Sequence, residues 1–230
     1  MPPSGDRYES VIAFFDEVYR RYERYWWRRE TRYSTEPADH AQSLITSHLL
    51  EALQSRPPGR ALDVGAGEGT DAIRLAHLGY EVDAVEGSSV GCEKTEQFAR
   101  QEGVRLNILN EDVNSFKPSA VYDVIVCNGL LHYIEEQTGL IQRLQDATAL
   151  KGLNAVSLWT ARTPVPECHQ IVDTYVDASS QTRDDWIVMR MYKHWSKVGQ
   201  WEEENKPETA HPGFGPHCHS FLKFIAERQD

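Results

Sequence analysis

The chain has 230 residues, of which 40% are hydrophobic, and a formal net charge of −11 at pH 7. This length suits one domain with a continuous buried core, and the acidic balance argues against a nucleic-acid substrate, because phosphate binding depends on lysine and arginine. The longest apolar runs, such as Val121 to Cys127, are far shorter than the roughly 18 residues needed to span a bilayer. The start has no basic and apolar leader. The four cysteines have neither zinc-site spacing nor the density of a secreted disulfide scaffold: Cys92, Cys127, Cys168 and Cys218. We therefore expect a cytoplasmic protein with reduced thiols, no membrane segment and no obligate protein partner.

Two helical patterns come first in the chain. Apolar residues recur in steps of three and four from Tyr8 to Trp26, which predicts one amphipathic helix. A second pattern runs from about Ala41 to Leu53 and is ended by Pro57, Pro58 and Gly59. We expect both helices, within residues 1–55, to lie against the rest of the domain.

The first helix is rich in arginine, which allows two interpretations. Asp16 with Arg20 and Glu17 with Arg21 have the favoured i,i+4 order, so this face is in part a solvated, salt-bridged surface. Alternatively, the helix closes over the site as a lid. In that case aromatic side chains beside the arginines contact the substrate: Tyr22, Tyr25 and Trp26.

From Arg60 onward, short β-rich runs alternate with helical segments, which is the rhythm of a parallel, doubly wound sheet. The expected strands are Ala61 to Val64, Glu81 to Val85, Leu106 to Leu109, Val121 to Cys127 and Asn154 to Trp159. The expected helices are Thr70 to Leu78, Val90 to Gln101, Glu135 to Leu150 and a last one around Arg183 to Trp195. Two terminal strands are expected at Val198 to Glu204 and Phe221 to Ala226. We divide the single domain 1–230 into N-terminal helices (1–55), a core (60–160) and a C-terminal segment (161–230).

A glycine-rich turn joins the first of these strands to its helix. Asp63 ends the strand, and Gly65, Ala66 and Gly67 follow it directly. Glycines let the backbone approach a ligand closely, and a helix N-terminus adds unpaired N–H donors. Dinucleotide-binding proteins use G-x-G-x-x-G, so Thr70 stands where their third glycine would be.

Two acidic positions follow at the ends of the next strands. Glu86, followed by Gly87, lies about twenty residues past the turn, where a carboxylate can accept both ribose hydroxyl protons. Asp112 can accept a proton from an adenine amino group, with the backbone N–H of Val113 beside it. Each feature alone has a structural explanation: tight packing for the glycines, a solvated turn for Glu86 and a helix cap for Asp112. Their order along the chain favours a nucleoside ligand.

Together with the run from Tyr122 to Asn128, these motifs resemble those of class I S-adenosylmethionine-dependent methyltransferases between about Arg60 and Trp159. The resemblance implies a Rossmann-like α/β fold with a seven-stranded sheet, mostly parallel and ending in an antiparallel hairpin. It also implies that Gly65 and Gly67 lie near the methionine portion of the cofactor and that Asn128 lies near its amino acid end. The ending of the chain is most similar to the TehB-like tellurite-resistance group. The segment Lys151 to Asn154 departs from the usual Lys-Pro-Gly-Gly turn.

Candidate catalytic residues lie where strands end. His132 and Tyr133 follow the fourth strand, whose carboxyl end lies at the ligand crevice of such sheets, although His132 could also only pack there. If Val198 to Glu204 runs parallel to the sheet, the loop after it overhangs the substrate, and His211 or His217 could orient or deprotonate it. No carboxylate or cysteine spacing completes a metal site with these histidines, so we expect none.

The sequence therefore predicts an enzyme that transfers the methyl group of S-adenosylmethionine in line to a small molecule and releases S-adenosylhomocysteine. Two alternatives remain at this point. The first is a nicotinamide-dependent oxidoreductase on the same sheet, and the second is a protein that binds S-adenosylmethionine without methyl transfer. The identity of the acceptor atom is not encoded in these motifs.

Overall fold

The computed structural model describes residues 4–25, 33–36, 44–134, 136–160, 187–208 and 216–229. Its centre is one seven-stranded sheet with the order β3-β2-β1-β4-β5-β7-β6. The strands are β1 (Arg60–Val64), β2 (Glu81–Glu86), β3 (Asn107–Asn110), β4 (Tyr122–Asn128), β5 (Thr148–Trp159), β6 (Ser196–Glu208) and β7 (His217–Glu227). β1 to β5 pair in parallel, whereas β7 pairs antiparallel with both β5 and β6. The predicted Rossmann-like sheet with an antiparallel terminal hairpin is confirmed.

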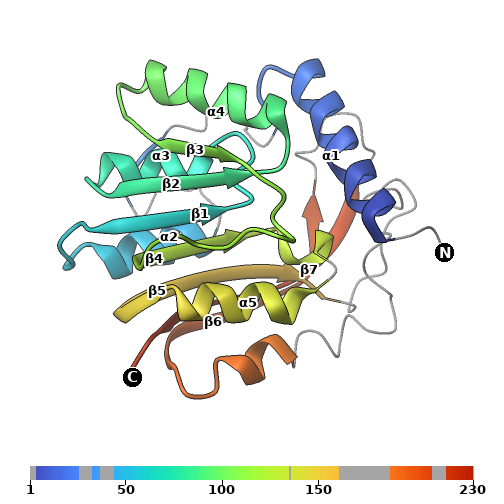
Figure 1. The fold of residues 1–230 in the computed structure, drawn as a ribbon. Coiled ribbons are helices and arrows are strands. Elements are labelled where there is room, and N and C mark those ends of the chain that lie inside the picture. Colours follow the sequence, from blue (N-terminus) through green and yellow to red (C-terminus); the bar gives the residue numbers. More distant parts are fainter. Residues whose placement is uncertain are drawn as a thin grey trace.

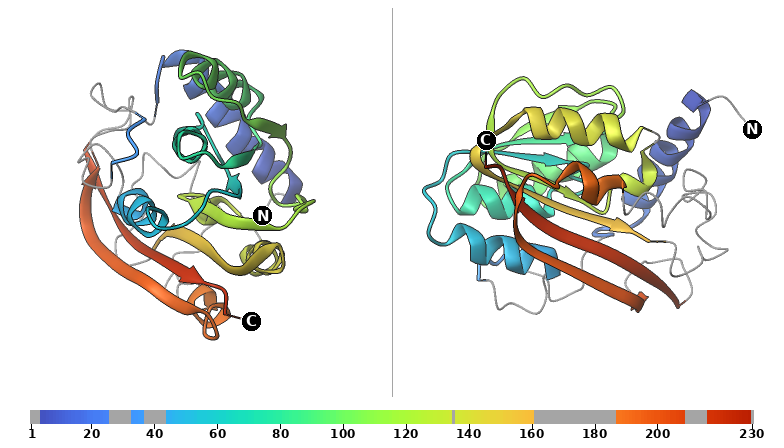
Figure 2. Two further views of the ribbon diagram at one scale, coloured as in Figure 1. Left: turned by 90° about the vertical axis from the view of Figure 1, so that its left-hand side faces the viewer. Right: turned by 90° about the horizontal axis from the view of Figure 1, so that it is seen from below.

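The sheet direction decides where a ligand can bind. Because β7 runs antiparallel to both of its neighbours, β6 runs in the same direction as β1 to β5. The β6–β7 hairpin forms one edge of the sheet and β3 forms the other (Figure 2). The carboxyl ends of six strands therefore face the same side, where the strand order reverses between β1 and β4.

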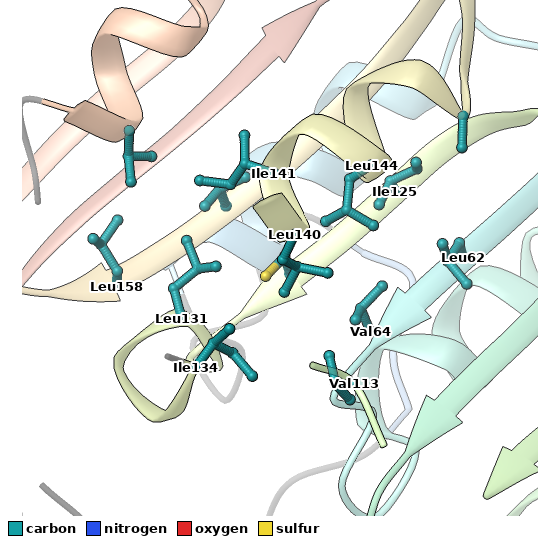
Figure 3. Packing of buried hydrophobic residues seen from close by; sticks show 14 of the residues in the cluster. Leu62, Val64, Val113, Ile125, Leu131, Ile134, Leu140, Ile141, Leu144 and Leu158 are labelled. Atoms are coloured by element: carbon teal, nitrogen blue, oxygen red, sulfur yellow. The ribbon is translucent and has the colours of Figure 1, made fainter. Parts of the chain in front are cut away.

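Helices cover both faces of the sheet. α2 (Leu44–Leu53) and α3 (Thr70–His77) pack on one face through a cluster that includes Leu49 and Leu75. α4 (Ser89–Gln101) joins that layer by packing Phe98 against Ile73 of α3. α5 (Gln137–Asp146) lies on the opposite face. It buries Leu140, Ile141 and Leu144 against Leu62, Ile125 and Leu158 of the strands (Figure 3).

α1 (Ser4–Arg21) stands apart from these layers, beside α4 and at the end of the sheet to which the arrowheads of the parallel strands point (Figure 1). Its buried side chains form a separate cluster with Val90 of α4 and Tyr133 after β4: Val11, Phe15, Val18 and Tyr19. Within the described ranges, no helix is both long enough and apolar enough to cross a membrane.

Several predicted boundaries were wrong. Both terminal strands are longer than expected, since β6 runs from Ser196 to Glu208 and β7 begins at His217. The first helix was expected to continue to Trp26, but it ends at Arg21, and Tyr22 to Tyr25 are not helical. The helix predicted at Glu135 to Leu150 is shorter, because Thr148 begins β5. The Thr148 hydroxyl lies within hydrogen-bond distance of two acceptors, the Leu144 carbonyl at 2.7 Å and Asn154 Oδ1 at 2.8 Å, and so ties the helix end to the strand.

The start of β5 also differs from the prediction, because the strand was expected to begin only at Asn154. The segment Lys151 to Asn154 is not a separate turn but lies inside this strand, where the pairing with β4 shifts register. Lys151 adopts a positive φ of 64° at this irregularity. Near the other end of the chain, a helix is present at 187–191, within the range predicted from Arg183 to Trp195, of which 183–186 lie outside the described residues.

Candidate functional site

A cavity of about 310 Å³ opens at the carboxyl ends of the strands, under α1. Most of the predicted site residues line it: Asp63, Gly65, Ala66, Gly67, Glu86, Gly87, Val113, Asn128, His132 and Tyr133. Asp112, His217, Tyr22 and Tyr25 are described but are not part of this lining. His211 and Trp26 lie outside the described residues.

The glycine-rich turn forms the floor of one end of the cavity. Gly65 has a φ of 73°, and a Cβ added there would lie 2.8 Å from a methyl carbon of Leu130. The N–H groups of Gly65 and Ala66 donate to the Val85 carbonyl at 2.8 and 3.0 Å, which fixes the turn to the end of β2. A side chain at Gly65 would thus be strained and would crowd the cavity.

Glu86 is buried beside this turn. Its carboxylate accepts the N–H of Gly67 and the N–H of Ser88, each at 2.8 Å. Burial raises the pKa of Glu86, and the two backbone donors offset part of this shift. Gly91 of α4 packs so closely that a Cβ there would lie 3.0 Å from Glu86 Cγ. The carboxylate is therefore pre-positioned, and it lines the cavity.

Asp63 holds the start of α3. Its Oδ2 accepts the N–H of Ala72 at 2.9 Å. Burial, followed by the charge of Asp71, raises the pKa of Asp63 well above its ordinary range. A cationic ligand in the cavity would relieve this cost, since an opposite charge favours the ionised carboxyl.

The two residues expected at the adenine have different surroundings. Val113 is buried and lines the cavity. Asp112 is exposed, and its Oδ1 accepts the N–H of Asn114 at 2.8 Å, which closes a local turn. The contact between Asp112 and an adenine amino group stays a prediction.

A buried polar network near the turn was not found from the sequence. Asp71 accepts hydrogen bonds from Thr46 Oγ1 at 2.9 Å and from Asn128 Nδ2 at 3.0 Å, and Arg74 lies 3.3 Å from it. Ser157 donates to Asn128 at 2.6 Å. All five residues line the cavity. In the sequence Asp71 and Arg74 have the spacing of an ordinary i,i+3 surface pair. In the structure, however, Arg74 is buried, with only 2% of its surface exposed.

An aromatic wall lies beyond this network. The rings of His132 and Trp159 are stacked with centroids 3.9 Å apart, and His219 stacks on Trp159 at 3.8 Å. His219 lines the cavity with the other two. His217 lies next to His219, with centroids 4.8 Å apart, but does not reach the lining.

α1 forms another wall of the cavity, with four side chains in the lining: Val11, Ile12, Phe15 and Tyr19. Two of the aromatic residues proposed for a lid, Tyr22 and Tyr25, are not among the residues that line the cavity. Tyr25 is 1% exposed and packs with Tyr19 in the α1 cluster. The expected Asp16–Arg20 ion pair is present at 3.4 Å, and Asp16 also accepts the Ser88 hydroxyl at 2.5 Å, which fastens α1 to the start of α4.

The chain is similar in sequence to one known protein family and in fold to solved methyltransferase structures. Residues 28–206 match the family model described as tellurite resistance protein TehB. The structure of TehB from Haemophilus influenzae superposes with a TM-score of 0.65 at 17% identity, covering 83% of this chain and 63% of that one. A 1,6-didemethyltoxoflavin-N1-methyltransferase from Burkholderia thailandensis, solved with bound S-adenosylhomocysteine, superposes over 100% of this chain and 92% of its own, with a TM-score of 0.62 and 18% identity.

Among curated proteins, the ubiquinone biosynthesis O-methyltransferase of Rickettsia canadensis is 28% identical over 113 residues, which is 49% of this chain and 46% of that protein. The enzyme of the same name from Rickettsia felis is 24% identical over 147 residues, covering 61% of this chain and 59% of its own length. The chain thus spans about half the length of the curated relatives it matches.

Proposed function

Because the chain belongs to the TehB family of tellurite resistance proteins, and because its cavity joins a glycine-rich turn to a buried carboxylate, we propose that it is an S-adenosylmethionine-dependent methyltransferase. The observation that carries this proposal is Glu86, which is fixed by Gly67 and Ser88 at the point where a ribose would lie. Its similarity to methyltransferases supports this function over a nicotinamide-dependent oxidoreductase. We further propose that the acceptor is a small molecule. We still only predict that the protein is cytoplasmic and that its substrate is not a nucleic acid.

The lining suggests how the cofactor would be held. Glu86 would accept the ribose hydroxyls, Val113 would contact the adenine, and the backbone of Gly65 and Gly67 would lie along the methionine portion. Bound S-adenosylmethionine supplies an electrophilic methyl carbon on a sulfonium. The carboxylates of Asp63 and Glu86 would favour this cationic ligand.

The Asp71–Arg74 pair fits the amino acid end of the cofactor. An α-amino acid carries an ammonium and a carboxylate side by side, and this pair offers one charge of each sign at the cavity floor. Thr46 and Asn128 hold the Asp71 carboxylate, so its position does not depend on the ligand. We propose that Asp71 faces the ammonium and that Arg74 faces the carboxylate.

For transfer, His132 would accept the proton of an acceptor hydroxyl or amine while the acceptor attacks the methyl carbon. The carbon–sulfur bond breaks, and its electron pair stays on sulfur. Stacking on Trp159 fixes the imidazole ring, and the wall of α1 side chains would exclude water. Alignment of the reactants is the main contribution expected of such an enzyme.

Calorimetry with S-adenosylhomocysteine and NAD tests the cofactor assignment. We expect micromolar binding of S-adenosylhomocysteine, no binding of NAD, and an affinity loss of about 1 to 3 kcal/mol for Glu86→Gln, because a hydrogen bond to a charged group is removed. Tight NAD binding without a response to S-adenosylhomocysteine would contradict the proposal. Formation of S-adenosylhomocysteine from S-adenosylmethionine with a panel of thiols, amines and phenols then distinguishes an enzyme from a binding protein.

The same variant has an expected effect on pH dependence. The folded pKa of Glu86 is raised above its ordinary value of 4.5, so the stability contributed by the protonated carboxyl is present at low pH and is lost as pH rises through the raised value. In Glu86→Gln this loss should be absent, so the free energy of unfolding of the ligand-free protein should fall less as pH rises above 4.5. Urea titrations at several pH values measure the slope. Parallel curves for the variant and the original protein would show that Glu86 has an ordinary pKa.

Arg74→Met tests the amino acid subsite. The variant should bind S-adenosylhomocysteine about 10-fold or more weakly, because a charged hydrogen-bond donor is lost, yet bind 5′-methylthioadenosine, which lacks the amino acid, as the original does. Arg100→Met is the matched control, because Arg100 lies on the surface of α4 with a side chain that is 71% exposed. If Arg74→Met weakens both ligands equally, Arg74 is only structural.

A further inference from the structure

Charge is unevenly distributed along the cavity. The acidic residues Asp63 and Glu86 lie at the ends of β1 and β2, beside the glycine-rich turn. Two lysines of the lining, Lys206 and Lys223, lie on β6 and β7. β1 and β7 are separated by β4 and β5, and three strand spacings amount to about 14 Å. The cavity thus has an acidic end, assigned above to the cofactor, and a basic end.

A bulge in β6 brings Lys206 to this face. Glu203 pairs with Phe221, and Lys206 pairs with His219, so two residues of β6 between these pairs, 204 and 205, are opposite the single residue 220 of β7. In a regular strand Glu203 and Lys206 would point to opposite faces, whereas the extra residue turns Lys206 to the side of Glu203. Asn205 adopts a positive φ of 50° here and donates its N–H to Ser220 at 3.0 Å.

The two lysines share one carboxylate. Lys206 lies 3.1 Å from Glu203, and Lys223 also forms an ion pair with Glu203. The side chain of Lys223 is only 5% exposed. Two ammonium groups against one carboxylate leave a net positive charge, and burying such a charge is costly unless a ligand or solvent compensates it.

Aromatic rings surround these charges. The ammonium groups of Lys223 and Lys206 lie 4.8 and 5.9 Å from the centre of the Phe221 ring. Phe221 pairs with Trp159 of the aromatic wall across the strands, and Tyr133 lies 6.0 Å from Trp159. A ligand here would meet flat apolar surfaces on its body and positive charge at one end.

We propose that this basic end is the acceptor site and that it binds the carboxylate of an aromatic acid, with Lys206 and Lys223 as the charged partners. The proposal rests on the proposed function, since it places the acceptor opposite the cofactor. Glu203 holds both lysines in position. An organic carboxylate is favoured over an inorganic oxyanion, because an inorganic oxyanion has no apolar body to contact the aromatic rings.

The test is calorimetry on protein already saturated with S-adenosylhomocysteine, so that failure of the cofactor assignment is seen first and separately. Benzoic and cinnamic acids are titrated alongside their neutral amides, and sodium selenite serves as the inorganic probe. We expect at least one acid to bind about tenfold or more tightly than its amide, because a charged hydrogen bond is worth at least that factor. Binding of selenite alone, equal binding of acids and amides, or no binding of any acid overturns the proposal.

Variants assign the effect to the lysines. Lys206→Met should reduce acid affinity about tenfold without changing amide affinity, and Lys206→Arg should restore it. Glu203→Gln should strengthen acid binding, because it removes the competing carboxylate, whereas a purely structural ion pair would give no such gain. Lys197→Met, which removes an exposed lysine of the same strand, is the charge-matched control. If Lys206→Met and Lys197→Met behave alike, Lys206 does not contact the acceptor.

Discussion

His132→Gln should lower turnover by about two to four orders of magnitude at saturating S-adenosylmethionine, the usual loss when a general base is removed. Affinity for S-adenosylhomocysteine should stay the same, because His132 follows β4 and no part of the proposed ribose or amino acid contacts depends on it. Imidazole is the side chain best suited to accept a proton near neutral pH. Single-turnover rates together with calorimetry separate the chemical step from binding.

Two further histidine variants decide between the candidates. His217→Gln is the matched control, since His217 does not line the cavity and should keep near-original turnover. His219→Gln should have an intermediate effect, because His219 stacks on the outer face of Trp159 and lies one strand farther from the turn. If all three variants turn over normally, none of these three histidines acts as a base. The role of His211 stays a prediction that its own Gln variant would test.

Lys94→Met should destabilise the protein by about 3 to 5 kcal/mol, the expected cost of leaving one partner of a buried ion pair without its counter-charge. Glu68, within the glycine-rich turn, is completely buried and accepts Lys94 Nζ at 2.5 Å. The same carboxylate accepts the N–H of Tyr25 at 2.9 Å, and Lys94 also donates to the Tyr22 carbonyl at 2.6 Å. The pair therefore binds the chain after α1 to the turn and to α4.

Urea denaturation of the ligand-free protein measures this loss. The double variant Lys94→Met with Glu68→Gln should recover much of it, because the amide oxygen can still accept from Tyr25 and no buried charge remains. Lys117→Met, at an exposed lysine, is the control for charge. A Lys94→Met variant as stable as Lys117→Met would show that the pair is solvated. Because Tyr22 and Tyr25 are held by this pair, deletion of residues 1–33 should also reduce the free energy of unfolding.

The proposed cofactor half of the site could be predicted from the sequence because it is local. The glycine-rich turn, Glu86 and Val113 each lie at or shortly after the end of a strand, and a parallel sheet brings successive strand ends to one edge. Apolar runs and their spacing therefore predict both the fold and the side of the sheet on which these residues meet. The antiparallel terminal hairpin was implied by the resemblance to the family, whereas the strand order came from the structure.

Tertiary structure alone decided the acceptor half. Lys206 faces the cavity only because one extra residue in β6 reverses its side, and a bulge at Asn205 has no period that a sequence pattern could reveal. Arg74 and Glu68 have the sequence context of solvated helix and turn residues, yet both are buried, and Glu68 accepts the N–H of Tyr25 from the chain after α1. Burial and long-range pairing depend on contacts between segments far apart in the chain, so the charge of the acceptor site emerged only when those segments were brought together.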